Sequence, residues 1–379
     1  MARKFRVLMT GGGTGGHIYP LLAVAIELQF LSVEEGIDLK LKYLGSYGSY
    51  KELLSLNNIK VQKIVSSKLR RYFSISNFWD FFKFSYGVLQ ALWKIYWFMP
   101  DVLFSKGGPG ALPVVLAAKF YRIPIIIHES DVVPGMTNIV SARFADIITV
   151  AFSGAAKYLG PASMPVGNPV RRYILPHGED EDNKTAKKLL EFDSDKFLIF
   201  VVGGSQGSTR INDFIIENLG DLLQSSQILH QTGRNNYEQV VGQVAFEVEK
   251  MPEAIKKNYK AVDYFENGLG DAMLAADLIV ARAGAGSIFE IAAFGKPSIL
   301  IPLPESAGDH QRYNAYEYAS TGASVVIEEE NLLPHLFMAQ LQKLLEHPEE
   351  LQRMGEAAKR FYKKDSALTL ARLILDFNK

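Results

Sequence analysis

A lone histidine follows a glycine-rich turn near the start of the chain, and its side chain could act as an acid or a base. Residues 9–20 read MTGGGTGGHIYP, with five glycines in six positions and His17 directly behind them. Histidine titrates near neutral pH, and glycine lets backbone approach a ligand closely. The turn therefore predicts a binding site in which His17 is a candidate general base.

The same turn matches a dinucleotide-binding pattern only in part. Gly11, Gly13 and Gly16 satisfy G-x-G-x-x-G after a predicted strand. A nicotinamide site also needs an acid at the end of the next strand, but residues 42–49 read KYLGSYGS, and no Gly-Lys-Ser/Thr of a P-loop follows the turn. The sequence favours another ligand, or a turn that serves only strand–helix packing.

Two later stretches also place polar groups after predicted strands. VVGGSQGS, residues 201–208, sets Ser205 and Gln206 in a glycine turn before a predicted helix, where free N–H groups attract phosphate. Residues 281–315 contain Ser287 and Glu290, which are spaced as a capping box. Glu290 is therefore predicted either to cap a helix or, from the first turn of that helix, to accept the hydroxyls of a ribose. Gln311 follows the next predicted strand.

The elements that must position these groups are short Val/Ile/Leu runs that alternate with helical patterns. Such continuous apolar runs are typical of parallel strands covered on both faces. The pattern restarts after a charged, Pro-containing interval, which predicts two α/β domains with a boundary near 168–175 and a solvated loop over 177–188. The predicted strands are 5–9, 41–45, 101–108, 123–130 and 145–152, then 196–204, 227–233, 261–265, 277–284, 297–303 and 323–327.

Composition excludes several classes of function. The 379 residues contain 41 Lys+Arg and 41 Asp+Glu, so the net charge gives no reason to expect nucleic-acid binding. The chain has no cysteine, which excludes disulfides, thiol catalysis and thiolate-bound zinc. The N-terminus enters a strand-like run without a signal-peptide pattern, so a cytoplasmic protein is expected.

One interval departs from this balance. Residues 60–100 contain seven Lys/Arg against one acid, Asp80, together with all three tryptophans. Its apolar part is interrupted by Lys83 and Lys94, and we expect it to be too short to span a bilayer. The interval predicts either a buried core helix or a helix that lies in a membrane interface.

Six ordered strings resemble one known family: GGGTGGHIYP, HESDVVPGMTN, VGNPVR, VVGGSQGS, ARAGAGSIFEIAAFGKPSILIPL and DHQRYNA. The chain resembles the family 28 glycosyltransferases of the GT-B fold, and among them the peptidoglycan enzymes that transfer N-acetylglucosamine from its UDP ester to lipid I. The resemblance implies two Rossmann-like doubly wound domains facing across a cleft. Residues 1–170 would bind the acceptor and membrane, 171–355 would bind UDP-N-acetylglucosamine, and a helix over 356–379 would pack back on the first domain.

The resemblance also implies roles for single residues. His17 would be the catalytic base, with His128 as its rival or as a residue that orients a loop. Asp131 stands where many members have Asn, and residues 107–113, GGPGALP, lack a Tyr and a Ser of the family pattern. Gly11, Gly12 and Gly13 would face the acceptor. Contacts with UDP-N-acetylglucosamine would fall to Thr14, Gly15, Gly16, Asp131, Arg171, Ser205, Gln206, Phe265, Glu266, Ala285, Gly286, Ser287, Glu290 and Gln311.

The implied reaction inverts the anomeric centre and forms a β-1,4 link to the muramyl sugar, giving lipid II for cell-wall growth, cell shape and division. No cofactor and no metal are expected. The enzyme would sit peripherally on the cytoplasmic face of the plasma membrane, beside other cell-wall synthesis proteins. A nucleotide-sugar 2-epimerase and a non-catalytic membrane-associated scaffold are the alternatives. The membrane contacts would be Lys68, Arg70, Arg71, Phe78, Trp79, Phe82 and Trp93.

Overall fold

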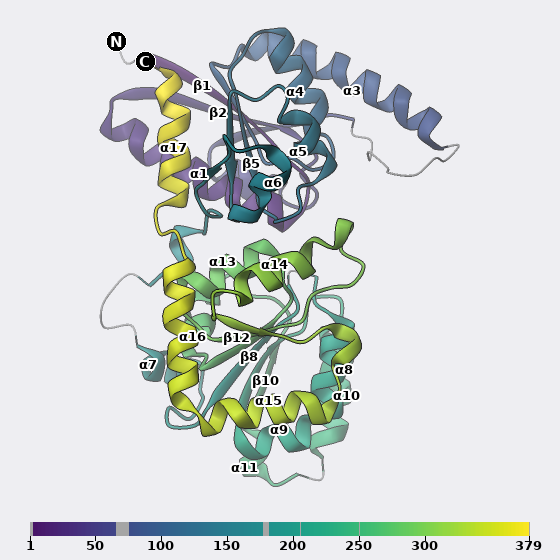
Figure 1. Ribbon diagram of the computed structural model, residues 1–379, viewed down its shortest axis with the longest axis vertical. Coiled ribbons are helices and arrows are strands. Elements are labelled where there is room, and N and C mark those ends of the chain that lie inside the picture. The colour runs from purple at the N-terminus through teal and green to yellow at the C-terminus, as the bar shows by residue number, and fades with distance from the viewer. Residues whose placement is uncertain (1–2, 66–75, 177–181, 205, 250, 379) are drawn as a thin grey trace. The chain divides into compact units, whose positions relative to one another are not determined.

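The computed structural model describes residues 3–65, 76–176, 182–204, 206–249 and 251–378, with the side chains of 76–81 and 378 left out. The chain divides into two compact units. Residues 1–171 and 363–379 form the first, and residues 172–362 form the second. Each is an α/β unit with helices on both faces of a parallel sheet (Figure 1).

The first unit contains a seven-stranded sheet in the order β3-β2-β1-β4-β5-β6-β7, and all its pairings are parallel. The strand order reverses between β1 and β4, and ligands of open α/β sheets bind outside the carboxyl ends of strands at such a point. The strands are β1 Arg3–Thr10, β2 Ile37–Gly45, β3 Ile59–Lys63, β4 Val102–Ser105, β5 Ile125–Glu129, β6 Ile147–Val150 and β7 Met164–Pro165. The sequence did not predict β3 and β7, the two edge strands, which are short or partly polar.

The helices of this unit cover both faces of the sheet. They are α1 Gly15–Glu34, α2 Lys51–Leu56, α3 Ser76–Phe98, α4 Ala111–Phe120, α5 Met136–Ser141, α6 Ala156–Leu159 and α17 Ser366–Leu375, with 3-10 turns at Ser153–Ala155 and Asp376–Asn378. By length and composition α1 could cross a membrane, but 56% of its apolar window is buried. Its Leu21 and Leu28 share a core with Leu370 and Ile374 of α17, which runs beside it (Figure 1). We therefore assign α1 as a core helix.

Helix α3 has two different faces. Ala91 and Ile95 are fully buried in the core beneath it. On the other side lies a stripe of exposed side chains at helical spacing, in which Trp93 is 65% and Trp97 is 70% exposed. We call this the aromatic stripe: Phe82, Tyr86, Leu89, Trp93, Tyr96 and Trp97. The helix is therefore part of the core on one face and exposed on the other, and its predicted place in a membrane interface stays a prediction.

The second unit contains a six-stranded parallel sheet in the order β10-β9-β8-β11-β12-β13, with its reversal between β8 and β11. All six strands that the sequence predicts are present, although β10 begins two residues earlier than expected. The strands are β8 Leu198–Val202, β9 Gln227–Gln231, β10 Tyr259–Val262, β11 Leu278–Ala281, β12 Ser298–Leu300 and β13 Ser324–Val326.

Helices cover both faces of this sheet as well. They are α7 Asn183–Leu189, α8 Thr209–Glu217, α9 Leu219–Ser225, α10 Tyr237–Val248, α11 Glu253–Lys256, α12 Leu269–Ala275, α13 Ala285–Ala293, α14 His310–Ala319, α15 Pro334–Glu346 and α16 Pro348–Phe361. Short 3-10 turns lie at Arg172–Ile174, Ala307–Asp309 and Glu329–Asn331. The helix predicted over 356–379 is interrupted, because α16 ends at Phe361 and α17 begins at Ser366, and α17 belongs to the first unit.

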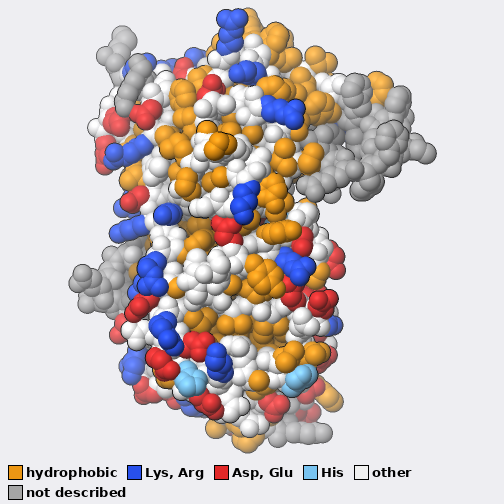
Figure 2. All heavy atoms as spheres, viewed as in Figure 1, with side chains coloured by type: hydrophobic (Ala, Val, Ile, Leu, Met, Phe, Trp, Pro, Cys, Tyr) orange, Lys and Arg blue, Asp and Glu red, His pale blue; other side chains and the backbone are white. Residues whose placement is uncertain are grey.

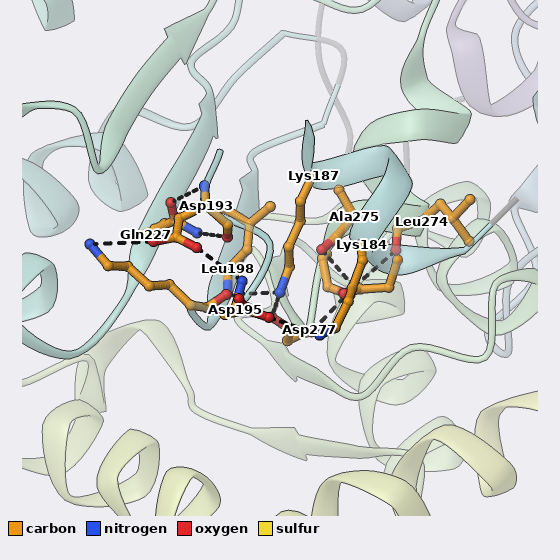
Figure 3. Close-up of polar contacts among 12 residues, drawn as sticks. Lys184, Lys187, Asp193, Asp195, Leu198, Gln227, Leu274, Ala275 and Asp277 are labelled. Carbon is orange, nitrogen blue, oxygen red and sulfur yellow. Dashed lines mark hydrogen bonds and ion pairs between the residues drawn. The ribbon is translucent and has the colours of Figure 1, made fainter. Parts of the chain in front are cut away.

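The solvated loop predicted over 177–188 is also wrong for its second half. Residues 183–189 form α7, and the Asp182 side chain caps it by accepting the N–H of Thr185 at 2.6 Å. Lys187 is buried, and its Nζ lies 2.6 Å from Oδ2 of Asp277 and 2.8 Å from the carbonyl oxygen of Lys196 (Figure 3). Oδ2 of Asp277 also accepts the N–H of Leu198 at 2.8 Å. An ion pair therefore fastens α7 to the sheet; residues 177–181 lie outside the described part.

Candidate functional site

The ring of His17 is held between two glycine loops of the first unit. His17 is the third residue of α1, and its Nδ1 lies 2.8 Å from Oγ1 of Thr14, the residue before the helix. A Cβ added to Gly12 would lie 2.8 Å from Nδ1, and one added to Gly108 would lie 2.8 Å from Nε2. Gly108 also has a φ of 82°, which favours glycine. Loops from both sides of the β1/β4 reversal therefore fix the orientation of a partly exposed imidazole.

The other glycines of the first turn differ in what they meet. A Cβ on Gly13 would come within 2.8 Å of the backbone nitrogen of Gly48, so Gly13 serves close packing. The carbonyl of Gly11 accepts a hydrogen bond from the Tyr43 hydroxyl at 2.8 Å. Gly16 is exposed, and a Cβ there would meet nothing within 4 Å. Gly16 and the first N–H groups of α1 therefore form the part of the turn that a ligand could approach.

Arg171 is fixed beside the same helix. Its side chain is buried, and its guanidinium carbon lies 4.1 Å from the ring centroid of Tyr19. Tyr19 is two residues after His17 on α1. Stacking of a guanidinium on an aromatic face is favourable and orients the cation. The structure thus places Arg171 in the first unit, in fixed relation to α1.

The rival base, His128, lies inside the sheet. It is 0% exposed on β5, and its Nδ1 lies 3.0 Å from Oγ1 of Thr149. Burial, followed by the charge of Lys106, holds the pKa of His128 well below its usual value. This neutral, enclosed ring suits the orienting role that the sequence offered as its alternative. Of the two candidates, His17 is the one that a substrate could touch.

Glu129, at the end of β5, closes the loop that contains Asp131. Its Oε1 accepts the N–H of Asp131 at 3.0 Å, and its Oε2 accepts the N–H of Gly135 at 3.2 Å and Nδ2 of Asn138 at 2.9 Å. Asp131 itself is half-buried. The sequence did not single out Glu129 or Asn138, although both lie in the string HESDVVPGMTN.

The altered loop over 107–113 takes its shape from glycine. Gly107, Gly108 and Gly110 have φ values of 73°, 82° and 92°. A Cβ on Gly107 would come within 2.5 Å of the Asn138 side chain. The loop therefore turns tightly over α5 before α4 begins, without the Tyr and Ser of the family pattern.

In the second unit, the glycine turn after β8 leads into α8. Gly204 and Gly207 have φ values of 85° and 77°. Ser208 caps the helix, and its Oγ also accepts a hydrogen bond from Nη2 of Arg282 at 2.7 Å. Gln206 is exposed, and Ser205 lies outside the described residues. The sequence missed Arg282, a buried residue that ties the end of β11 to the start of α8.

The predicted capping box at α13 is wrong. The helix begins at Ala285 after Gly284, and no side chain caps it. Ser287 is therefore the third helical residue, and Glu290 lies in the second turn instead of the first. Glu290 is half-buried. The N–H groups of Ala285, Gly286 and Ser287 begin this helix, where N–H groups lack intrahelical acceptors.

The remaining donor-side predictions are partly engaged within the protein. Oε1 of Gln311, the second residue of α14, accepts the N–H of Leu303 at 3.1 Å, so the amide oxygen is already used within the protein. The N–H of Phe265 donates to Oε1 of Gln231 at 3.2 Å, so this N–H is already used within the protein. Glu266 forms an exposed ion pair with Arg234.

Metal-ligating side chains do not gather in the described part of the chain. Among those residues, no three His, Asp or Glu side chains are grouped closely enough to hold a metal ion. Polar groups at both sites are instead carried by loops and helix N-termini. The two sites are thus suited to anionic ligands.

Comparison with known proteins identifies similar proteins over nearly the whole chain. The family model described as glycosyltransferase family 28 N-terminal domain matches residues 7–150, and the C-terminal domain model matches residues 198–370. A relative from Clostridium perfringens strain SM101 is 36% identical over 92% of both chains. One from Clostridium botulinum strain Loch Maree is 37% identical over 90% of this chain and 91% of its own. Both are called UDP-N-acetylglucosamine--N-acetylmuramyl-(pentapeptide) pyrophosphoryl-undecaprenol N-acetylglucosamine transferase.

Solved structures agree on the fold. The crystal structure of Acinetobacter baumannii MurG is 26% identical, with a TM-score of 0.74 over 98% of this chain and 99% of its own. A UDP-GlcNAc 2-epimerase from Neisseria meningitidis is 13% identical, with a TM-score of 0.65 over 98% of this chain and 100% of its own, and shows the fold alone. The predicted GT-B fold is confirmed, and the chain belongs to glycosyltransferase family 28.

Proposed function

We propose that this chain transfers N-acetylglucosamine from UDP-N-acetylglucosamine to the C4 hydroxyl of the muramyl sugar in lipid I, with inversion at the anomeric carbon. The observation that carries the proposal is the oriented His17, held by two glycine loops at the N-terminus of α1. The names of the relatives supply the substrates, because they act on an N-acetylmuramyl pyrophosphoryl-undecaprenol acceptor.

The reaction requires that the protein remove one proton from the acceptor and stabilise one leaving group. His17 takes the proton of the attacking hydroxyl, and such a positioned base contributes ~10²–10⁴-fold to the rate. The hydroxyl oxygen attacks the anomeric carbon as the bond to UDP breaks. The N–H groups at the starts of α8 and α13 stabilise the negative charge of UDP. This proposal requires no metal or cofactor.

The acceptor belongs to the first unit in this scheme. Its diphosphate is attracted to the N-terminus of α1, next to Gly16, where the backbone is open to a ligand. Arg171, stacked on Tyr19 of the same helix, adds a fixed positive charge. His128 keeps β5 and the loop after it in place through Thr149.

The donor belongs to the second unit, and Glu290 provides a direct test. We propose that its carboxylate accepts the two ribose hydroxyls. Glu290→Gln should raise the KM for UDP-N-acetylglucosamine about 10- to 100-fold, because each hydrogen bond to a charged group contributes ~1.5–3 kcal/mol. Steady-state kinetics with varied donor measures this. Glu217→Gln, at the exposed end of α8, is the matched control; equal donor KM values for the two variants would refute the role of Glu290.

The aromatic stripe on α3 supports the membrane part of the proposal. Six exposed apolar side chains follow one face of the helix, and an exposed apolar patch of this kind marks an interaction surface. Lys68, Arg70 and Arg71 precede the helix in sequence, outside the described residues, and Phe78 and Trp79 lie where no side chain is described. In Figure 2, hydrophobic side chains are prominent on the visible face of the first unit, whereas acids and bases intermix on that of the second.

Vesicle binding tests this surface. Trp93→Ala with Trp97→Ala should lower binding to vesicles containing anionic phospholipid by at least tenfold, since the indoles lose apolar burial in the interface. Replacing Lys68, Arg70 and Arg71 with Ser should weaken binding about fivefold per charge and reduce its salt sensitivity. Phe246→Ala, an equally exposed aromatic of the second unit, is the control. Unchanged vesicle binding in both sets would exclude this surface as the anchor.

Product analysis tests the transfer itself. Purified protein incubated with UDP-N-acetylglucosamine and a lipid I analogue should yield UDP and a disaccharide-lipid whose new bond is β-1,4 by NMR. A 2-epimerase, the alternative that shares the fold, needs no lipid and would produce the 2-epimer of the donor. A scaffold would produce neither.

A further inference from the structure

A buried lysine links three segments behind the acceptor side of the first unit. Lys106 directly follows β4 and is 2% exposed. Its Nζ lies 2.6 Å from Oγ of Ser130, after β5, and 3.3 Å from Oδ1 of Asn168. The Ser130 hydroxyl donates to the same Asn168 oxygen at 3.0 Å. One ammonium group thus joins the ends of two strands and the segment that leads to Arg171.

Two carboxylates, those of Glu129 and Asp131, act on this lysine through their charge. Burial lowers the pKa of Lys106, and the charges of Glu129 and then Asp131 raise it in part. Burial also raises the pKa of Glu129, and the charge of Asp131 raises it further. A buried charge is tolerated when it is paired and hydrogen-bonded. The cation of Lys106 therefore offsets the negative charge that Asp131 brings to a loop already containing Glu129.

The segments that Lys106 joins are those that carry the proposed acceptor site. The N–H of Lys106 donates to the carbonyl of Thr10 at 2.9 Å. A Cβ on Gly11 would lie 3.5 Å from Cβ of Lys106 and 3.6 Å from Cβ of His17, so both residues flank this glycine. Asn168 lies three residues before Arg171, which stacks over Tyr19. A shift of Lys106 would therefore move groups on both sides of His17.

We propose that Lys106 is a positioning residue for the acceptor, which holds the Ser130–Asp131 loop and the Asn168–Arg171 segment in place and whose charge allows a carboxylate at position 131. The inference rests on the proposed function, since it assigns the positioned groups to acceptor binding. At 2% exposure Lys106 does not contact the substrate itself. Its effect passes through Ser130, Asp131 and Asn168.

Lys42 provides a matched comparison within the same unit. It is also a buried lysine, at 5% exposure, but its Nζ lies over the Phe98 ring and 3.5 Å from the carbonyl oxygen of Lys94. Burial and two neighbouring lysines lower the pKa of Lys42 to about 8. Lys42 is therefore a second lysine of low exposure whose pKa is shifted by burial and neighbouring lysines and not by carboxylates.

The test is a double-mutant cycle on the full chain with Lys106→Met, Asp131→Asn and the double variant. Lys106→Met should raise the KM for a lipid I analogue about tenfold or more, while the KM for UDP-N-acetylglucosamine changes less than twofold. In the Asp131→Asn background the same change should cost threefold or less, because the charge that interacts with Lys106 is gone. Ser130→Ala, which keeps the charge but removes the hydroxyl, should raise the acceptor KM in the same direction by a smaller factor.

Three outcomes would overturn the inference: additive effects in the cycle, an equal rise in both substrate KM values, or the same acceptor KM change in Lys42→Met. If Lys106→Met does not fold, an unchanged acceptor KM in Ser130→Ala would overturn it instead. The Tm values of the wild type, the two single variants and the double variant test this inference independently of the proposed function. Without transfer by the wild type, the proposed function fails, but a non-additive Tm cycle would still show the charge coupling between Lys106 and Asp131.

Discussion

His17→Ala is expected to lower kcat for N-acetylglucosamine transfer by about 10²–10⁴-fold, the contribution typical of a positioned general base. The KM for UDP-N-acetylglucosamine should change little, because the proposed donor site lies in the second unit. The physical reason is the fixed ring: Thr14, Gly12 and Gly108 hold the imidazole in one orientation, and alanine leaves no group there to accept the proton. Single-turnover kinetics at saturating substrates measures the chemical step.

His335→Ala is the control for this variant, since His335 is exposed on α15 of the second unit and should retain full activity. His128→Gln tests the rival. Because His128 is fully buried, its loss should lower Tm together with activity. Full kcat in His17→Ala would remove His17 as the base, and a folded His128→Gln with the larger loss of kcat would assign the role to His128.

Asp277→Ala should destabilise the second unit by about 3 kcal/mol, because it removes the carboxylate that pairs with the buried ammonium of Lys187. The Nζ of Lys187 would lose its acceptor at 2.6 Å, and the N–H of Leu198 would lose its own at 2.8 Å (Figure 3). Asn183, which also donates to Asp277, would lose a contact at 3.2 Å. Denaturant unfolding followed by intrinsic fluorescence measures the change in the free energy of unfolding.

The same region supplies a control for Asp277→Ala. Asp195 pairs with Lys184 at 2.8 Å, but both side chains are largely exposed, so Asp195→Ala should unfold at the wild-type denaturant concentration. Equal unfolding midpoints for the two variants would show that the Lys187–Asp277 pair does not fasten α7 to the sheet.

Much of the fold follows from the sequence because its signals are local. Runs such as LIFVV of β8 and IIIHE of β5 are apolar enough to predict buried parallel strands, and the glycine turns fall where their strands end. The edge strands β3 and β7 escaped prediction because they carry few apolar residues. The helix α7 was not predicted because Lys187 reads as a surface residue in the sequence. Its partner, Asp277, lies 90 residues away in sequence.

A site residue could be predicted from the sequence where a single motif contains it together with its neighbours in the site. His17 and the glycines around it follow from one string, but the role of Gly108 in holding the ring depends on a loop about 90 residues further on. Lys106 stood in the sequence as an ordinary lysine, because its partners Ser130 and Asn168 come from two other segments. The capping-box error at Glu290 arose because the residue before α13 is Gly284, which has no side chain to mark the start of the helix.

The central claim is acceptor-dependent glycosyl transfer, and the rate of UDP release by the purified wild-type chain tests it most directly. With UDP-N-acetylglucosamine and a lipid I analogue, we expect UDP release to match formation of the disaccharide-lipid mole for mole. Omitting the lipid should reduce the release to background. UDP release that does not depend on the lipid, or formation of the donor's 2-epimer without any transfer, would contradict the proposed function.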